Sequence, residues 1–170
     1  MQAEVSAPRI YVASLSDYNA GRLHGAWIDA TDADDMRDAI AAMLKASPEP
    51  IAEEWAIHDT DGFGSYSVSE YADLDAVAAI ASGIAEYGDA FSAWVNDGNE
   101  PDTDDFQDHY VGTFGSFRDY ADAIADDFIP DDAPEFLKTY FDYDAFARDL
   151  EHDYCVIDRT DGYGVHVFTY

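Results

Sequence analysis

The amino-acid sequence predicts an α+β fold divided into three small subdomains. Segments in which apolar and polar residues alternate, as in strands, lie near both ends of the 170-residue chain. In the middle, apolar residues recur at helical spacing, and a chain of this length is long enough for one ordinary domain or a few very small ones. We therefore expect an N-terminal ββαβ-like subdomain over 1–61, an acidic helical subdomain over 62–103 and a C-terminal α+β subdomain over 104–170.

The N-terminal subdomain is expected to contain three strands and one helix. β-Branched and aromatic residues alternate with smaller ones in Arg9–Leu15, His24–Ala30 and Glu54–Asp59, which is typical of strands. Thr31 precedes three aspartates in the next four residues, and a capping hydroxyl followed by first-turn carboxylates favours a helix start there. The helix is expected to end at 47–50, where two prolines stand.

The middle subdomain is expected to be helical. Apolar residues from Tyr71 to Ile84 recur at helical spacing, and a second short helix is expected over Ala90–Val95. The turn-rich segment Asn96–Asp105 is the expected boundary before the last subdomain. The structure of the next segment, Phe106–Phe114, stays open from the sequence.

The C-terminal subdomain is expected to combine helices with a pair of strands. Two prolines break the chain between the first two of the expected helices, which are Ser116–Phe128, Glu135–Tyr140 and Tyr143–Glu151. Strands are expected over Tyr154–Asp158 and Val165–Thr169, joined by a tight turn built on the Asp-Gly of TDGYG.

The motif Thr-Asp-Gly-aromatic-Gly occurs twice, at 60–64 and at 160–164, each time after an expected strand. An internal duplication of an αβ unit explains the repeat, and so does the use of the same turn chemistry in two hairpins. The sequence leaves both explanations open.

The chain carries a formal charge of −29, from 37 acids against 8 Lys and Arg. Residues 61–110 hold 12 acids and no Lys or Arg, so this part cannot neutralise itself with salt bridges of its own. The 48% hydrophobic content is far above that of a disordered acidic tail, and 28 of the acids are Asp, whose charge lies close to the backbone. The sequence therefore indicates a folded protein with fixed negative charge; adaptation to high salt, or a compositional habit of the source, is the open alternative.

The composition also indicates the cellular compartment of the protein and the charge of its binding partner. The single cysteine, Cys155, excludes an intrachain disulfide and indicates a reducing compartment. No segment has the pattern of a secretory signal or of a membrane span, so we expect a soluble cytoplasmic protein. Charge repulsion disfavours nucleic acid and membranes as partners and favours a basic groove.

Motifs that would indicate catalysis or metal binding are weak. Asp59, Asp61, Gly64 and Glu70 match four positions of a calcium-loop pattern, but Phe63 occupies a ligand position and a strand is expected where that motif needs a helix. The five histidines lack zinc-site spacing, and the sequence has neither a phosphate-binding glycine loop nor GxSxG. We therefore expect no enzymatic activity, no metal and no cofactor.

Two runs of the sequence resemble signatures of the ArdA antirestriction family. The run IYVASLSDYNAGRLHGAWIDA at Ile10–Ala30 is similar to the opening signature of that family. The run FLKTYFDYDAFARDLEHDY at Phe136–Tyr154 is similar to its later signature, which includes the antirestriction motif. The resemblance extends from about Arg9 to the end of the chain.

The resemblance implies an elongated homodimer of small domains whose acidic side chains mimic the phosphates of bent B-form DNA. It also implies a protein carried by mobile genetic elements that protects incoming DNA by inhibiting type I restriction-modification enzymes. In that family the antirestriction motif lies at the dimer contact, which corresponds here to Phe136, Leu137, Tyr140, Phe141, Tyr143, Phe146 and Leu150. The aromatic density of this segment independently favours an interface, with local core packing as the open alternative.

The magnitude of the charge fits this interpretation. B-DNA carries one charge per roughly 1.7 Å of axis, so 29 charges correspond to about 50 Å of duplex and a dimer to roughly twice that length. The mimic is expected to be collective and to come from the base-free middle of the chain and its flanks. The acids predicted to contribute are Asp73, Asp75, Glu86, Asp89, Asp97, Asp102, Asp104, Asp105, Asp108, Asp119, Asp122, Asp126 and Asp127.

The alternative function is a halophilic or generic acidic adaptor that binds a basic protein partner unrelated to restriction. A halophilic fold requires molar salt, whereas a DNA mimic is folded at ordinary salt and competes with oligonucleotides for its partner.

Overall fold

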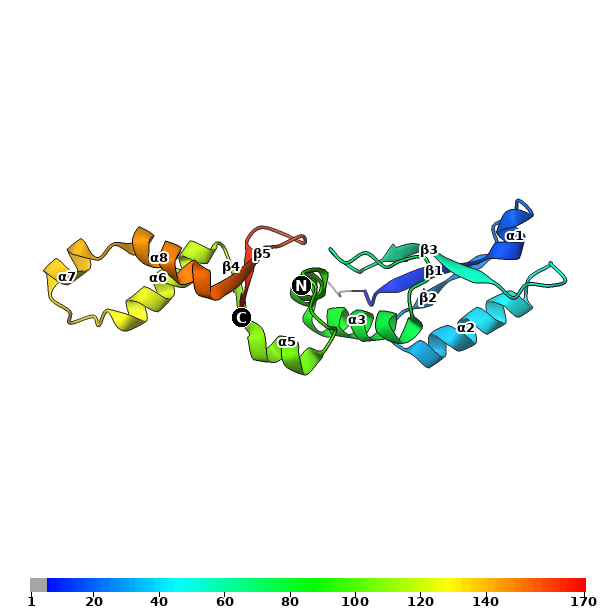
Figure 1. The fold of residues 1–170 in the computed structure, drawn as a ribbon, viewed down its shortest axis with the longest axis horizontal. Helices are drawn as coiled ribbons and strands as arrows, with labels where there is room; N and C mark the ends of the chain where they lie inside the picture. Colours follow the sequence, from blue (N-terminus) through cyan, green and yellow to red (C-terminus); the bar gives the residue numbers. More distant parts are fainter. Residues whose placement is uncertain (1–5) are drawn as a thin grey trace. The chain divides into compact units, whose positions relative to one another are not determined.

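The structure is a computed structural model that describes residues 6–170 (Figure 1). Helices are combined with small antiparallel sheets, which confirms the predicted α+β class. The chain divides into two compact units, one up to Thr103 and one from Asp104 to Tyr170. This division lies inside the turn-rich segment 96–105; a further division between residues 61 and 62, and an elongated arrangement, stay predictions.

The first unit contains a three-stranded antiparallel sheet in the order β2-β1-β3. The strands are β1 (Arg9–Ser14), β2 (Gly25–Asp29) and β3 (Trp55–Asp61), which confirms the predicted strands to within two residues at each end. Ile10 and Ile28 face each other across β1 and β2 and are buried on one side of the sheet.

Helix α2 (Ala33–Lys45) covers that side of the sheet with its apolar stripe (Figure 1). It is capped by Asp32, whose carboxylate accepts hydrogen bonds from two backbone N–H groups of the first turn at 2.9 Å. The predicted cap, Thr31, is therefore one residue early. Its hydroxyl donates instead to the carboxylate of Asp29 at 2.5 Å.

A short helix, α1 (Leu15–Asn19), follows β1 where the sequence predicts the end of a strand and a loop. Ser14 caps it by accepting a hydrogen bond from the N–H of Asp17. The Asp17 side chain is fully buried and accepts a hydrogen bond from the Ser47 hydroxyl at 2.5 Å, which lowers the pKa of Asp17 below its ordinary value of 3.8. Asp17 therefore joins α1 to the segment after α2, a contact that hydrophobic alternation does not encode.

Helices α3 (Leu74–Tyr87) and α4 (Asp89–Asn96) complete the first unit and confirm the two predicted helices. They meet at Gly88, whose φ of 68° lies in the region that favours glycine. Helix α4 packs on α3 by placing the buried ring of Phe91 against Gly83, which has no side chain to block it.

The second unit is built on an antiparallel sheet in the order β4-β6-β5. The strands β5 (Tyr154–Asp158) and β6 (Val165–Thr169) have the bounds that the sequence predicts. The segment Phe106–Phe114, whose type the sequence leaves open, divides between the end of helix α5 (Thr103–His109) and β4 (Tyr110–Phe114).

The three predicted helices of the second unit are confirmed as α6 (Phe117–Phe128), α7 (Glu135–Tyr140) and α8 (Tyr143–Leu150). A single 3-10 turn, Glu151–Asp153, follows α8 in place of the last predicted helical residue. One buried cluster between α6, α8 and the sheet contains Phe117, Ala121, Ala147 and Val167, and Phe106 of α5 and Phe168 of β6 are also fully buried in this unit.

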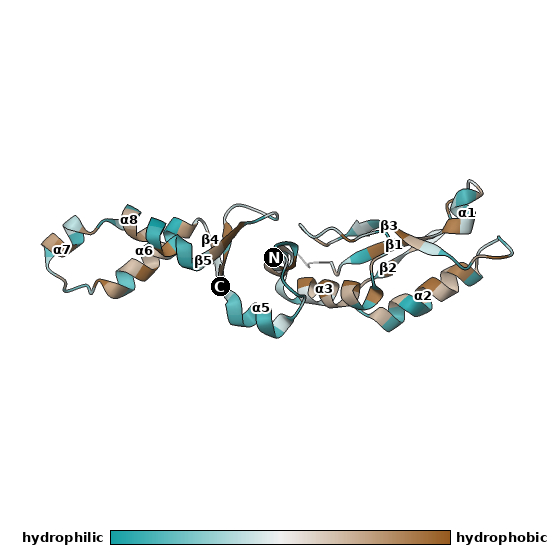
Figure 2. Cartoon of the chain, in the orientation of Figure 1, coloured by the Kyte–Doolittle hydropathy of each residue, from teal (hydrophilic) through white to brown (hydrophobic). Residues whose placement is uncertain are grey.

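Polar residues interrupt the apolar ones along the helices. Figure 2 shows α5 as largely hydrophilic, and α2 and α6 as helices in which hydrophilic and hydrophobic residues follow one another. Among residues 6–170, no helix has both the length and the apolar content that a membrane crossing needs.

The two copies of the Thr-Asp-Gly-aromatic-Gly motif have different structures. In the first copy, Phe63 is buried and its carbonyl accepts a hydrogen bond from the Ser92 hydroxyl at 2.7 Å, and irregular chain follows. The second copy joins β5 and β6 through the loop 159–164, in which Tyr163 is 88% exposed. The second copy therefore forms the predicted hairpin connection, which the Arg159 N–H closes by donating to the Gly164 carbonyl at 3.0 Å. The explanation of the repeat by two hairpins is wrong for the first copy, because no strand pairs with β3 through it among the described residues.

The contact between α3 and α4 predicts that replacing Gly83 by alanine destabilises the protein, although such a replacement within a helix usually stabilises it. In an ordinary helix, replacing Gly by Ala stabilises by roughly 1 kcal/mol. In Gly83→Ala the new Cβ would lie 2.1 Å from a ring carbon of Phe91, so we expect destabilisation by about 1–3 kcal/mol from overpacking. Urea unfolding of the full chain measures the change.

The exposed Ala85 of the same helix provides the control. Ala85→Gly should lose only the helix propensity, about 1 kcal/mol. A Gly83→Ala variant that unfolds at higher urea than wild type would contradict the described packing of Phe91.

Candidate acidic interaction surface

The carboxylates of this chain lie almost entirely on its surface. Of the 36 Asp and Glu residues within 6–170, 32 are exposed, three (Glu49, Asp89 and Asp122) are half-buried and Asp17 is buried. Glu4 lies outside the described residues. The first unit has 20 acids against 4 Lys and Arg in sequence, and the second has 17 against 4, so each unit is strongly acidic by itself.

The 13 acids predicted as phosphate mimics are distributed over both units. Six belong to the first unit and seven to the second, and all except Asp89 and Asp122 are exposed. Within the second unit they gather on two helices, with Asp104, Asp105 and Asp108 on α5 and the remaining four, Asp119, Asp122, Asp126 and Asp127, on α6.

An arginine bridges two helices in the first unit. Arg37 of α2 donates to Asp34 on its own helix at 2.9 Å and to Asp75 of α3 at 2.5 Å. These two carboxylates, Asp75 first, raise the pKa of Arg37. Asp75 lies in the first turn of α3, which Asp73 caps by accepting two backbone hydrogen bonds at 3.0 Å.

The second unit repeats this arrangement with different helices. Arg118 of α6 donates to Asp122 on its own helix at 2.6 Å and also to Asp144 of α8. These carboxylates, Asp122 first, raise the pKa of Arg118. Asp144 lies in the first turn of α8, which Asp142 caps by accepting a hydrogen bond from the N–H of Ala145 at 2.9 Å. In both units an arginine therefore holds the capped start of a neighbouring helix.

The set of acids predicted from the sequence lacks several aspartates that cap helices or bind these arginines. Asp32, Asp34, Asp142 and Asp144 are exposed and fixed by local hydrogen bonds or ion pairs, yet none belongs to the predicted set. An aspartate followed two residues later by a second one at a helix start is the signal that could have found the cap pairs.

The other arginines are also engaged by carboxylates. Arg9 contacts Asp61 at 2.6 Å and Arg159 contacts Asp161 at 2.7 Å. Arg22 contacts the carboxylates of Asp17 and Glu49, and Arg148 contacts Asp149. Each of the six arginines thus has a carboxylate partner within 6–170, which reduces the positive charge that a partner would meet.

The structure divides the seven predicted dimer-contact residues into two groups. Phe136, Leu137 and Tyr140 of α7 are 61%, 50% and 84% exposed. Phe146 and Leu150 of α8 are partly buried and pack against the core of the second unit; their role at a dimer contact stays a prediction.

The other two aromatics lie between these groups. The ring centroid of Phe141 lies 4.7 Å from that of Tyr143 and 5.5 Å from that of Phe146. The Tyr143 hydroxyl donates to Asp126 at 3.4 Å, and burial, followed by the charge of Asp126, raises the pKa of Tyr143. Phe128 at the end of α6 is also exposed, at 77%, and so are Tyr163 and Tyr170 elsewhere in the second unit.

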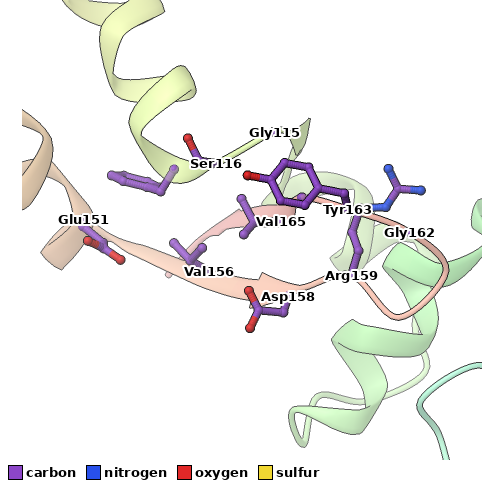
Figure 3. Close-up of a pocket in the computed structure, with 11 residues that line it drawn as sticks. Gly115, Ser116, Glu151, Val156, Asp158, Arg159, Gly162, Tyr163 and Val165 are labelled. Carbon is purple, nitrogen blue, oxygen red and sulfur yellow. The ribbon is translucent and has the colours of Figure 1, made fainter.

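A depression of about 590 Å³ lies beside the loop between β5 and β6 in the second unit (Figure 3). Figure 3 shows Val156 between Glu151 and Asp158, so these two carboxylates do not face each other. Arg159 at its edge already pairs with Asp161. Glu151 and Asp158 therefore do not form a direct carboxylate pair in this depression.

The weak calcium pattern gains no support from the fold. Asp59 and Asp61 lie on β3, and Asp61 accepts a hydrogen bond from Arg9 at 2.6 Å. Within residues 6–170, no group of three His, Cys, Asp or Glu side chains is placed to hold a metal ion.

Comparison with known proteins identifies the family. A family model described as antirestriction protein (ArdA) matches residues 10–165, which is most of the chain. No match was found among curated proteins. The matched range includes both runs that resemble the ArdA signatures, so the chain belongs to the ArdA family of antirestriction proteins.

Proposed function

We propose that this protein inhibits type I restriction-modification enzymes by occupying their DNA-binding groove as a mimic of duplex DNA, without catalysing a reaction. The observation that carries the proposal is the exposure of 32 carboxylates in a chain whose arginines are each engaged by a carboxylate. A groove lined with basic residues would meet a surface of almost uniformly negative charge.

The charge density of single helices supports the proposal. The four carboxylates of α6 from Asp119 to Asp127 span eight residue steps, or about 12 Å at 1.5 Å per residue. The mean spacing of these four carboxylates along the axis is therefore about 4 Å, which is of the same order as the roughly 3.4 Å between phosphates of a single DNA strand. Because Asp122 is paired with Arg118 of the same helix, Asp119, Asp126 and Asp127 are the carboxylates of α6 that a basic groove would meet.

Short side chains and caps support a fixed array. An aspartate has fewer rotatable bonds than a glutamate, so its charge stays close to the backbone position. Asp73 and Asp142 are fixed further because they cap helices, and Asp75 and Asp144 because arginines from other helices hold them. Fixed carboxylates lose little conformational entropy when the groove binds them.

The mechanism that follows is competition. Basic residues of the enzyme contact the carboxylates in place of phosphates, so association should be fast and sensitive to salt. No base edges are reproduced, and inhibition should therefore extend over enzymes with different recognition sequences.

We further propose that the protein acts as a homodimer that joins through α7. Phe136, Leu137 and Tyr140 expose apolar surface on a helix of six residues without a buried side chain. Monomeric proteins seldom leave such surface open. A dimer would double the charge and with it the length of duplex that the pair imitates.

The proposal predicts displacement of DNA from the enzyme. Titrating the purified protein into a type I enzyme bound to fluorescently labelled duplex should release the DNA, with an affinity that falls steeply between about 50 and 200 mM salt. Fluorescence anisotropy measures the release. Circular dichroism at about 150 mM salt should show a folded protein; unfolding at this salt, with folding only at molar salt, would favour the halophilic alternative.

Variants of the acids test whether the effect is collective. Asp127→Asn alone should weaken displacement by less than about fivefold, as for one exposed ion pair. The set Asp119→Asn, Asp126→Asn and Asp127→Asn should multiply such losses, whereas Asp158→Asn, outside the predicted acids, serves as the single-charge control. Loss of inhibition from any one of these single replacements would rule out a distributed mimic.

The bridging arginine of the second unit predicts a local change in backbone protection. Arg118→Gln removes the link between α6 and the start of α8, so amide hydrogen exchange in the first turn of α8 should become several-fold faster. Arg118→Lys should behave in the same way, because one ammonium cannot hold two carboxylates as a guanidinium fork does.

Arg148→Gln provides the control for this exchange experiment, since Arg148 contacts only the adjacent Asp149 among the ion pairs described for it. In Arg148→Gln, the backbone amides in the first turn of α8 should exchange at the same rate as in wild type. Unchanged exchange in Arg118→Gln would mean that the cap of Asp142 alone holds the helix start.

The dimer proposal predicts a change in mass. The double variant Phe136→Ser and Tyr140→Ser should shift the protein from dimer to monomer in sedimentation equilibrium at the same concentration. Tyr163→Ser removes an aromatic of comparable exposure from the loop between β5 and β6 and should leave the mass unchanged. A wild-type protein that sediments as a monomer at every concentration would refute the dimer.

A further inference from the structure

Among the described residues of the first unit, one side of the sheet has no helix along its strands. Helices α2 and α3 lie along the other side (Figure 1). On the open side, the strand register places Trp27 of β2 opposite Tyr11 of β1, and Tyr11 opposite Asp59 of β3. The next row on the same side is Asp29, Arg9 and Asp61, again in register across the three strands.

This open side combines aromatic rings with carboxylates. Trp27 remains 44% exposed although its ring contacts that of Tyr11, with 5.5 Å between the centroids. Asp29, Asp59 and Asp61 are exposed around the two rings. We name the set Tyr11, Trp27, Asp29 and Asp59 the Trp27 face.

The Trp27 face already holds one guanidinium of this chain. The guanidinium carbon of Arg9 lies 5.3 Å from the centroid of the Trp27 ring, and the same group donates to Asp61 at 2.6 Å. An arginine placed over tryptophan gains a cation–π attraction, which is strongest for this ring type. Arg9 thus serves as an internal example of the chemistry that this face accepts.

The carboxylate of Asp29 is held in place by Thr31. It accepts hydrogen bonds from the Thr31 hydroxyl at 2.5 Å and from the Thr31 N–H at 2.9 Å. These bonds, the hydroxyl first, lower the pKa of Asp29, so the group stays ionised under ordinary conditions. Asp59 is likewise held by the N–H of Thr60 at 2.8 Å.

We propose that the Trp27 face binds an arginine side chain of the basic protein that this inhibitor occupies. The guanidinium would stack on the exposed part of the Trp27 ring while Asp29 and Asp59 accept its hydrogen bonds. Arginine fits better than lysine because its planar fork both stacks on rings and binds carboxylates with two parallel bonds. This inference rests on the proposed function for the identity of the partner.

Charge complementarity excludes the other occupants. Nucleic acid would be repelled by a unit whose sequence carries 20 acids against 4 bases. A second copy would place the same carboxylates against each other. Stacking of an arginine on an aromatic ring is a contact that carboxylates in place of phosphates do not provide. Tryptophan and arginine are also among the residues that often dominate the binding energy of protein interfaces.

Replacing the ring tests the contact. Trp27→Ala should weaken displacement of DNA from the enzyme by about tenfold, as for loss of a partly desolvated cation–π pair. The slope of affinity against salt should not change, because no charge is removed. Trp27→Phe retains a ring and should lose less, which keeps the test valid if the alanine variant is poorly folded in thermal unfolding.

Tyr71→Ala provides the control, since Tyr71 is a 70% exposed aromatic of the same unit outside the Trp27 face. Its affinity for the enzyme should equal that of wild type. Equal affinities of wild type, Trp27→Ala and Trp27→Phe would overturn the proposal while leaving charge mimicry in place. A wild-type protein that displaces no DNA would instead refute the proposed function.

A second measurement does not need the enzyme. In nuclear magnetic resonance titrations at about 150 mM salt, an arginine homopeptide should shift the indole N–H signal of Trp27 at lower concentration than a lysine homopeptide of equal length. Equal shifts with both peptides, or none at Trp27, would overturn the arginine contact. A sedimentation experiment in which Trp27→Ala dissociates a dimer would do so as well, by showing a second copy on this face.

Discussion

Repulsion among exposed carboxylates is the constraint that the rest of this structure has to satisfy. Unpaired surface charge of one sign destabilises a compact state, and the opposing contribution has to come from apolar burial and local hydrogen bonds. The first unit buries large side chains such as Phe91 and Met36, and the second buries Phe106 and Phe168 beside a cluster around Phe117 and Val167. Arg22, Arg37 and Arg118 each contact carboxylates from two different segments.

Many of the charges are part of the framework that carries them. Asp32, Asp73 and Asp142 cap the starts of α2, α3 and α8, and their negative charge lies at the favourable end of each helix dipole. The same carboxylates remain exposed. Stabilisation of a helix end and display of charge are therefore achieved by one group.

Most helices and strands could be predicted because their apolar residues follow the periods of 3.6 and 2. The short helix α1 could not, since it depends on the buried contact between Asp17 and Ser47, which are 30 residues apart. Exposure of the acids followed from composition. The bridge between Arg37 and Asp75 did not, because 38 residues separate them and only the packing of α3 near α2 brings them together. The division of the aromatic segment between α7 and the core also needed the fold, since Phe136 and Phe146 are alike in sequence and differ in burial.

The use of aspartate as a helix cap has a consequence for how such a surface changes over generations. Asparagine caps a helix about as well as aspartate, so an exchange at Asp73 or Asp142 preserves folding and removes one charge from many. Selection acting on stability would not detect the exchange, and selection acting on binding would detect it only weakly. Charge can then be lost and regained at different positions, and lineages of this fold can drift apart in sequence while keeping the same total field.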